Sequence, residues 1–174
     1  MIGNLDWVPV ADRPDLLADP VAAAVRDVRD QDVRVAEIDP DLADTAAFCE
    51  RYGVPLEASA NCVIVAAKRG GELRHAACMV LATQRADVNG VVRRHLDARK
   101  ASFAPMDQAT TLTGMEYGGI TPLGLPAPWP VLVDAAVAGE AHVVIGSGLR
   151  RSKLLLPGKT LAELPQAEVI ALAQ

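Results

Sequence analysis

Apolar residues run almost without interruption through two segments, and this is the strongest structural signal in the chain. Residues 61–67 and 73–81 are separated by Lys68-Arg69-Gly70-Gly71, a pattern typical of a β-hairpin with a glycine-containing turn. We expect these two segments to be central strands. Shorter strands are predicted at residues 33–38, 100–103, 131–134, 141–145, 154–156 and 167–172.

The predicted helices are short and irregularly placed. Residues 12–31 are predicted to be helical, because Asp19-Pro20 is a typical N-cap and Val21, Val25 and Val28 then recur at helical spacing. Further helices are predicted at 42–52 before Gly53, after Asp87, at 106–112 before Gly114, and at 160–164, where Thr160 and Glu163 have capping-box spacing. We therefore expect an α+β fold: a curved, mostly antiparallel mixed sheet, partly closed like a barrel, with short flanking helices.

The composition narrows the class of protein. The 174 residues fit one domain with a short appendage, and with 51% hydrophobic but only 3% aromatic residues the core must be aliphatic. No apolar run approaches the ~18 residues of a membrane span, and the N-terminus lacks a signal-peptide pattern, so a cytoplasmic location without a membrane partner is expected. Cys49, Cys62 and Cys78 show no C-x-x-C spacing and the histidines are scattered, so neither a disulfide framework nor a metal site is expected.

Charge is distributed unevenly along the chain. Residues 1–60 carry five Arg against thirteen acidic residues, whereas residues 61–100 carry eight basic residues against three acidic ones. A protein with a net charge of −5 can still bind a polyanion through one basic face, because the local field governs that contact. The candidates for such a face are Arg93, Arg94, Arg99 and Lys100, joined by Arg150, Arg151 and Lys153. A solvated surface of mixed charge is the alternative.

Residues 113–124 hold four glycines and a proline in twelve positions. This composition excludes a helix interior or a central strand, and it predicts a structured loop whose N–H groups converge on a negatively charged oxygen. A tight turn is the alternative. Asp134 fits either a turn residue or a carboxylate that orients a substrate ammonium or a water, and Gly146-Ser147-Gly148 fits either a turn or a second source of bare N–H groups. No Ser-His-Asp arrangement, Walker loop or dinucleotide fingerprint is visible.

The order of these features resembles the YbaK/EbsC family of aminoacyl-tRNA editing domains, which are also found inserted in bacterial prolyl-tRNA synthetases. The resemblance covers residues 33–173, so we expect an acidic helical extension at 1–32 and the editing domain at 33–174. The segments that carry it are Asn61-Cys62-Val63-Ile64-Val65-Ala66, the helix capped by Asp87, Gly118-Gly119-Ile120-Thr121-Pro122-Leu123-Gly124, Val131-Leu132-Val133-Asp134 and Gly146-Ser147-Gly148.

The resemblance implies a hydrolase that deacylates a mischarged aminoacyl-tRNA in trans, with a tRNA-Pro-type error as substrate and with no metal or cofactor. Water and the substrate's own hydroxyl or thiol would take part, while backbone N–H groups hold the ester carbonyl and the terminal ribose. The catalytic set it implies is Asn61, Gly118, Gly119 and Asp134. The implied substrate-binding residues are Ile120, Thr121, Pro122, Gly146, Ser147 and Gly148, and the tRNA would contact Arg93, Arg94, Arg99, Lys100, Arg150 and Arg151.

Asn61 departs from the family pattern, in which a lysine usually stands at this position and is credited with holding a phosphate or carbonyl. Asparagine donates only a neutral hydrogen bond, roughly half as strong as a charge-assisted one. A second hypothesis is therefore a non-catalytic protein that binds tRNA or an aminoacyl-adenosine, and a third is a scaffold for protein interaction. The expected partners are an aminoacyl-tRNA and an aminoacyl-tRNA synthetase, not DNA. The sequence is compatible with either a monomer or a homodimer.

Overall fold

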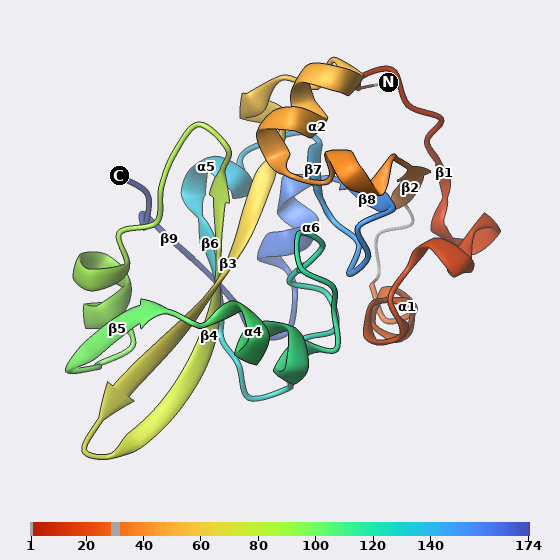
Figure 1. Cartoon of the computed structure of the whole chain (residues 1–174). Helices are drawn as coiled ribbons and strands as arrows, with labels where there is room; N and C mark the ends of the chain where they lie inside the picture. Colours follow the sequence, from red (N-terminus) through yellow and green to blue (C-terminus); the bar gives the residue numbers. More distant parts are fainter. Residues whose placement is uncertain (1, 29–31) are drawn as a thin grey trace.

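The computed structural model describes residues 2–28 and 32–174, and its strands form two sheets with short helices around them (Figure 1). In the larger sheet, of strand order β5-β3-β4-β6-β9, the β3–β4 hairpin and the β3–β5 pair are antiparallel, while β6 joins β4 and β9 joins β6 in parallel. The strands are β3 (Ala60–Arg69), β4 (Glu72–Leu81), β5 (Lys100–Phe103), β6 (Val131–Asp134) and β9 (Ala167–Ile170). The predicted hairpin is thus confirmed.

The smaller sheet is antiparallel, with strand order β1-β2-β8-β7. Its strands are β1 (Val8–Pro9), β2 (Arg34–Glu37), β7 (Val143–Gly146) and β8 (Ser152–Leu156). A bridge between Ser59 and Val144 links the two sheets. The α+β class is confirmed, but the partly closed barrel is wrong, because closure needs a continuous ladder of paired strands and both sheets here end in edge strands.

Three apolar layers hold the sheets and helices together. Val35, Leu154 and Met79 belong to the main core between the two sheets. Phe48 of α2 (Thr45–Tyr52) covers the outer face of the smaller sheet, and Val92 covers the outer face of the larger one. Figure 1 shows the corresponding helices on opposite sides of the molecule. Since side chains alternate along a strand, Lys153 of β8 lies on the α2 side and Leu154 on the main-core side.

The other helices are short and mostly end where glycine or a polar cap is available. They are η1 (Val10–Asp12), η2 (Pro14–Leu16), α1 (Asp19–Val25), η3 (Pro40–Leu42), η4 (Leu56–Ala58), the π-helical turn η5 (Val88–Val92), α3 (Arg93–His95), α4 (Met106–Thr113), α5 (Ala135–Ala138) and α6 (Gly158–Ala162). Gly53 and Gly114 end α2 and α4 in the left-handed conformation, with φ of 67° and 70°. Asp87 caps η5 by accepting from the amides of Gly90 and Val91, as predicted. None of the helices in the described residues is long and apolar enough to cross a bilayer.

Three predicted helix boundaries are wrong. The helix predicted at 42–52 is α2, which begins at Thr45 after the separate turn η3. In the first helix the N-cap is Ala18 and not Asp19, and the segment before it forms two 3-10 turns; its predicted end at 29–31 lies outside the described residues. The last helix begins at Gly158, so Thr160 and Glu163 do not form a capping box. Position 158 is packed too closely for a side chain, because a Cβ on Gly158 would lie 2.1 Å from the carbonyl oxygen of Val137.

The N-terminal segment packs against the same core as the rest of the chain. Leu16 and Val21 are buried in the main core, and β1 is the edge strand of the smaller sheet. The packing is close: a Cβ on Gly148 would lie 2.5 Å from Cβ of Ala18, and one on Gly124 would lie 2.4 Å from the carbonyl oxygen of Pro20. The segment therefore supports the loops that carry the glycines.

Candidate functional site

A cavity of about 300 Å³ lies where the N-terminus of α2, the start of β3, the residue 113–124 loop and β7–β8 meet. We call residues 113–124 the glycine loop. Four of the site residues predicted from the sequence line this cavity: Asn61, Gly118, Ile120 and Gly146. Segments far apart in the chain thus converge on one concave surface, which is the usual setting of a small-molecule or active site.

The glycine loop is paired with the turn that follows β7. The amide of Glu116 donates to the carbonyl of Gly148 at 2.9 Å, and the amide of Gly148 donates to the carbonyl of Gly119 at 2.6 Å. A Cβ on Gly119 would lie 2.8 Å from the backbone of Leu149, and a Cβ on Gly146 would lie 2.6 Å from the carbonyl oxygen of Gly119. The glycines are required because only a bare backbone permits this approach.

Two backbone donors of the loop are left for a ligand. Gly118 has a φ of +80°, and the hydrogen bonds among the described residues leave the N–H groups of Gly118 and Ile120 without an acceptor, whereas the N–H of Gly119 donates to Glu116. Both residues line the cavity. Backbone N–H groups held in this way can stabilise an oxygen on which negative charge develops.

Asn61 meets the first residue of α2. The hydroxyl of Thr45 donates to its Oδ1 at 2.6 Å, which leaves the amide nitrogen as the group that can reach a ligand. That nitrogen makes no hydrogen bond to the described residues. Asn61 can therefore donate a neutral hydrogen bond into the cavity, but it offers no charge there.

Lys153 also lines the cavity, and sequence reasoning missed its role. It is only 7% exposed; its Nζ donates to the carbonyl of Ala43 at 2.9 Å and lies 5.2 Å from the ring centre of Phe48. Desolvation lowers the pKa of its ammonium to about 8, against the opposing influence of Cys49 and Asp44. Its expected place on an exposed basic face is wrong, because β8 runs between β2 and β7 and α2 covers its outer face.

Arg150 braces the glycine loop against η3. Its guanidinium donates to the carbonyls of Tyr117 and Pro40 at 3.0 and 2.9 Å and lies over the Tyr117 ring at 5.6 Å. Its amide donates to a carboxylate oxygen of Glu116. The loop is thus held in place by a cation next to the cavity.

The comparisons with known proteins identify the fold and the family. The family model of the aminoacyl-tRNA editing domain matches residues 39–164. The chain belongs to this family. A crystal structure of a proposed trans-editing enzyme for prolyl-tRNA synthetase superposes with a TM-score of 0.76 at 21% identity, covering 90% of this chain and 96% of that one. Hypothetical protein APE2540 superposes with a TM-score of 0.78 at 19% identity, covering 90% and 100%. A search of curated proteins finds no match.

Asp134 lies outside the cavity of this editing domain. It is 5% exposed at the end of β6, where one carboxylate oxygen accepts from the amide of Ala136 at 3.1 Å and the other accepts from the amides of Leu172 and Ala173 at 3.0 and 3.1 Å. The carboxylate therefore caps α5 and fixes the C-terminal segment. This differs from its expected place beside the substrate.

The remaining predicted pocket residues support the loops from behind. Ser147 is fully buried, and its hydroxyl is shared with Ser152 at 2.6 Å, so it has no route to a ligand. Gly119, Gly148 and Thr121 do not line the cavity. Pro122 lines a different cavity.

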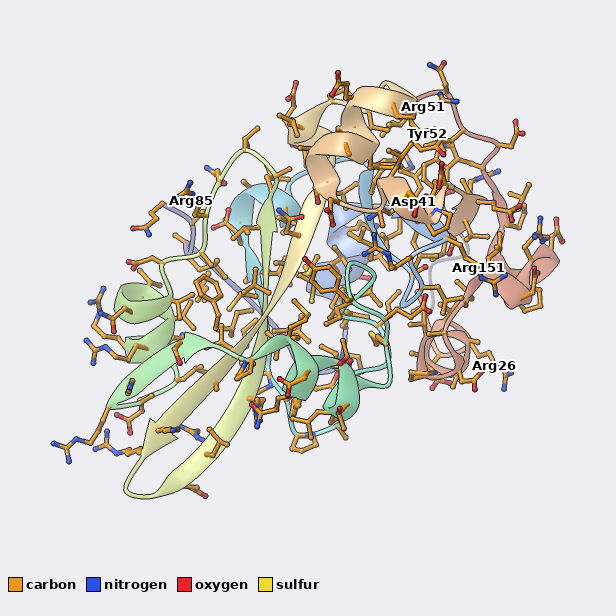
Figure 2. All side chains as sticks on the ribbon, in the orientation of Figure 1. Arg26, Asp41, Arg51, Tyr52, Arg85 and Arg151 are labelled. Carbon is orange, nitrogen blue, oxygen red and sulfur yellow. The ribbon has the colours of Figure 1, made fainter. Side chains whose placement is uncertain are left out.

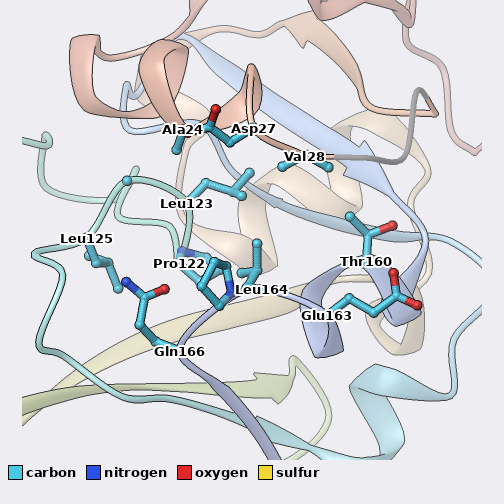
Figure 3. Close-up of a pocket in the computed structure, with 12 residues that line it drawn as sticks. Ala24, Asp27, Val28, Pro122, Leu123, Leu125, Thr160, Glu163, Leu164 and Gln166 are labelled. Atoms are coloured by element: carbon cyan, nitrogen blue, oxygen red, sulfur yellow. The ribbon is translucent and has the colours of Figure 1, made fainter.

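That second cavity, of about 580 Å³, separates α1 from the end of the glycine loop and from α6 (Figure 3). Pro122, Leu123 and Leu125 form one wall, and the carboxylates of Asp27 and Glu163 lie at its rim. Carboxylates repel phosphates. The cavity at Asn61 also has one carboxylate, Asp44, but it carries the ammonium of Lys153 as well, whereas the residues lining the second cavity include no cation. The second cavity is therefore the poorer candidate for a polyanionic substrate.

The six basic residues predicted to meet the tRNA do not form one face. Arg94, Arg99 and Lys100 are exposed around α3 and β5, and Arg93 donates to the carbonyl of Asn89. Arg150 is bound to the glycine loop, and Arg151 donates to the carbonyl of Asp15. Figure 2 shows Arg151 on the N-terminal side of the molecule, opposite Arg85.

The cavity offers no activated protein nucleophile. Cys62 lines it, but desolvation, with a smaller contribution from Cys78, raises the pKa of its thiol, so the thiolate is scarce at neutral pH. Among residues 2–28 and 32–174, no group of three or more His, Cys, Asp or Glu side chains could hold a metal ion. The groups available at the cavity are hydrogen-bond donors, the ammonium of Lys153 and the carboxylate of Asp44.

Proposed function

We propose that the protein is a free-standing hydrolase that removes a wrong amino acid from an aminoacyl-tRNA in trans. The observation that carries the proposal is the cavity in which two unpaired N–H groups of the glycine loop meet Asn61 and Lys153, in a chain of the editing family. An error of tRNA-Pro is the preferred substrate, since a prolyl-tRNA synthetase trans-editing protein is among the structural neighbours.

In this proposal, the ester between the amino acid and the terminal ribose binds with its carbonyl oxygen at the N–H groups of Gly118 and Ile120. A water attacks the carbonyl carbon, and negative charge moves to the carbonyl oxygen. The carbonyl re-forms as the bond to the ribose oxygen breaks, and the ribose oxygen takes up the proton that the water gives up, which releases the amino acid and the free tRNA. Each oriented donor that meets the developing oxyanion contributes roughly 100-fold or more to the rate. The protonated thiol of Cys62 takes no part as a nucleophile.

The test is a deacylation panel of tRNA-Pro charged with alanine, cysteine, serine or threonine, with correctly charged prolyl-tRNA as the matched control. At least one mischarged member should be hydrolysed well above the uncatalysed rate while prolyl-tRNA is spared. Gly118→Ala serves as the site variant, because a Cβ there would lie 2.5 Å from Nη1 of Arg150 and would disturb the loop. If no member of the panel is turned over, the hydrolase proposal fails.

Asn61 favours a second candidate, a protein that binds tRNA or an aminoacyl-adenosine without hydrolysing it. Its side chain is neutral, and its oxygen is already occupied by Thr45. This candidate predicts saturable binding of a non-hydrolysable aminoacyl-adenosine with no turnover of any charged tRNA. Efficient hydrolysis of one panel member would exclude it.

A further inference from the structure

We propose that the ammonium of Lys153 binds the acyl-ester end of the substrate, donating to the carbonyl oxygen that becomes negatively charged during hydrolysis. This inference rests on the function proposed above and names a residue that meets the reacting group. It assigns a substrate contact to the centre of the smaller sheet, on the wall of the cavity that β8 provides.

The first support is an ammonium whose hydrogen bonds are incomplete. An ammonium has three N–H donors, yet within the described part of the chain Nζ of Lys153 has one acceptor, the carbonyl of Ala43. No carboxylate oxygen of the described residues lies within 4.0 Å of it. Buried charges in proteins are normally paired, because an unpaired one is costly. Two donors are thus left for a group that enters the cavity.

The second support is the space around the side chain. In the strand register, Lys153 stands between Gly146 of β7 and Ala36 of β2. Cross-strand partners point to the same face of a sheet, so a larger residue at position 146 would stand beside the lysine stem and take up cavity space. Gly146 instead lines the cavity together with Lys153. The small neighbours leave the ammonium open toward the substrate.

The third support is the charge around the ammonium. The groups that act on it are Asp44, which is the N-cap of α2, Cys49 within α2, and Arg150 before β8. Asp44 is too far for an ion pair, and Arg150 is occupied by the carbonyls of Tyr117 and Pro40. Lys153 is therefore the cation of the cavity wall, and two of its three donors have no acceptor among the described residues.

The decisive variant is Lys153→Met, which keeps an unbranched side chain and removes the charge. Its matched control is Lys159→Met, because Lys159 is exposed on α6 and lies outside the cavity. We expect Lys153→Met to lower kcat/KM for deacylation about 100-fold or more, as the loss of one oxyanion donor does, while Lys159→Met stays within threefold of wild type. Thermal unfolding of both variants checks that they are folded.

The ratio of wild-type to Lys153→Met rates should also depend on pH. Because the ammonium loses its proton near pH 8, the ratio should fall toward one between pH 7 and pH 10. The substrate's own amino group titrates in the same range but is common to both proteins and cancels. A ratio that stays constant, or a Lys153→Met rate within threefold of wild type, overturns the inference and leaves the hydrolase proposal standing.

If no charged tRNA is turned over, the binding affinity for a non-hydrolysable aminoacyl-adenosine amide tests the Lys153 contact separately from the hydrolase proposal. Binding that weakens tenfold or more in Lys153→Met, and not in Lys159→Met, supports the contact even though the hydrolase proposal has failed. Equal affinity of wild type and Lys153→Met, or no binding by wild type, overturns the inference.

Discussion

Lys153→Met should stabilise the fold at neutral pH even as it removes a substrate contact. Burial lowers the pKa of the lysine from its ordinary 10.5 to about 8, a difference that corresponds to about 3 kcal/mol against the charged form. The variant loses the hydrogen bond to the carbonyl of Ala43, which costs about 1 kcal/mol. The variant also loses the contact of the ammonium with the Phe48 ring, which a sulfur–aromatic contact of the methionine replaces at similar strength. The net gain in the free energy of unfolding should be about 2 kcal/mol at pH 7.

The pH dependence of stability isolates the contribution of the charge. In the unfolded chain the lysine holds its proton up to its ordinary pKa of 10.5, whereas in the folded protein it loses the proton near pH 8. Between these values the unfolded state binds more protons, so the stability of the wild type rises with pH, by about 2.5 kcal/mol between pH 7 and pH 10. Below about pH 7 this contribution is constant, because the lysine is then protonated in both states. Lys153→Met lacks the rise, so its advantage should disappear near pH 10.

Urea unfolding of both proteins at pH 7, 8, 9 and 10 measures this difference. Titrating groups that do not interact with Lys153, including the thiols of Cys62 and Cys78, cancel in the comparison. The thiol of Cys49 does not cancel, because the charge of Lys153 lowers its pKa, so Cys49→Ala is introduced into both chains as the background. The refuting result is a constant difference in unfolding free energy from pH 7 to pH 10, because it would mean that the ammonium is fully solvated in the folded protein.

Two further substitutions, Gly119→Ala with Gly71→Ala as its control and Asp134→Ala, test how the loops and the strand ends are held. Gly119→Ala should destabilise the fold by about 2 kcal/mol or more, because its Cβ would lie 2.8 Å from the backbone of Leu149. In the control Gly71→Ala the new Cβ meets nothing within 4 Å, so the substitution should cost only about 1 kcal/mol for the positive φ of this residue. Urea unfolding measures both free energies. Asp134→Ala should cost about 2–4 kcal/mol by leaving three amides without their acceptor, and activity per folded molecule should stay within threefold of wild type, a result that a catalytic role for this carboxylate would contradict.

Sequence patterns predict those features of the fold that depend only on residues close together in the chain, such as helix ends and caps. Gly53 and Gly114 were identified as helix ends because the left-handed conformation favours glycine, and Asp87 was identified as a cap because its side chain reaches amides a few residues away. Pairing between distant strands could not be predicted in this way. Nothing in the sequence of β7 or β8 indicates that they pair in a separate sheet with β2, so a single curved sheet was expected in place of two.

The candidate site, too, could be predicted only in part from the sequence. Asn61, Gly118, Ile120 and Gly146 were assigned by resemblance, and they meet at one cavity. The resemblance also assigns Ser147 and Asp134 to the site, but their side chains form hydrogen bonds within the protein. From sequence alone, a hydroxyl or carboxylate at a strand end fits a structural role and a ligand-binding role equally well. The role of Lys153 could not be predicted because it closely follows Arg150 and Arg151 in the sequence, and such a basic segment suggests an exposed surface. The burial of Lys153 could have been inferred from the continuous apolar segment that follows it, because such a segment indicates a central strand with both faces covered.

Lys153 also changes what is expected of Asn61. The neutral side chain at position 61 suggested a site without its cation, yet the cavity wall already carries an ammonium from β8. In Asn61→Lys two ammonium groups would share one cavity, and like charges lower each other's pKa. The added lysine would also lose the hydrogen bond from Thr45. We therefore expect Asn61→Lys to leave kcat/KM unchanged or lower at pH 7, measured on the best member of the deacylation panel. A large gain in kcat/KM would instead show that the ammonium of Lys153 does not reach the reacting ester.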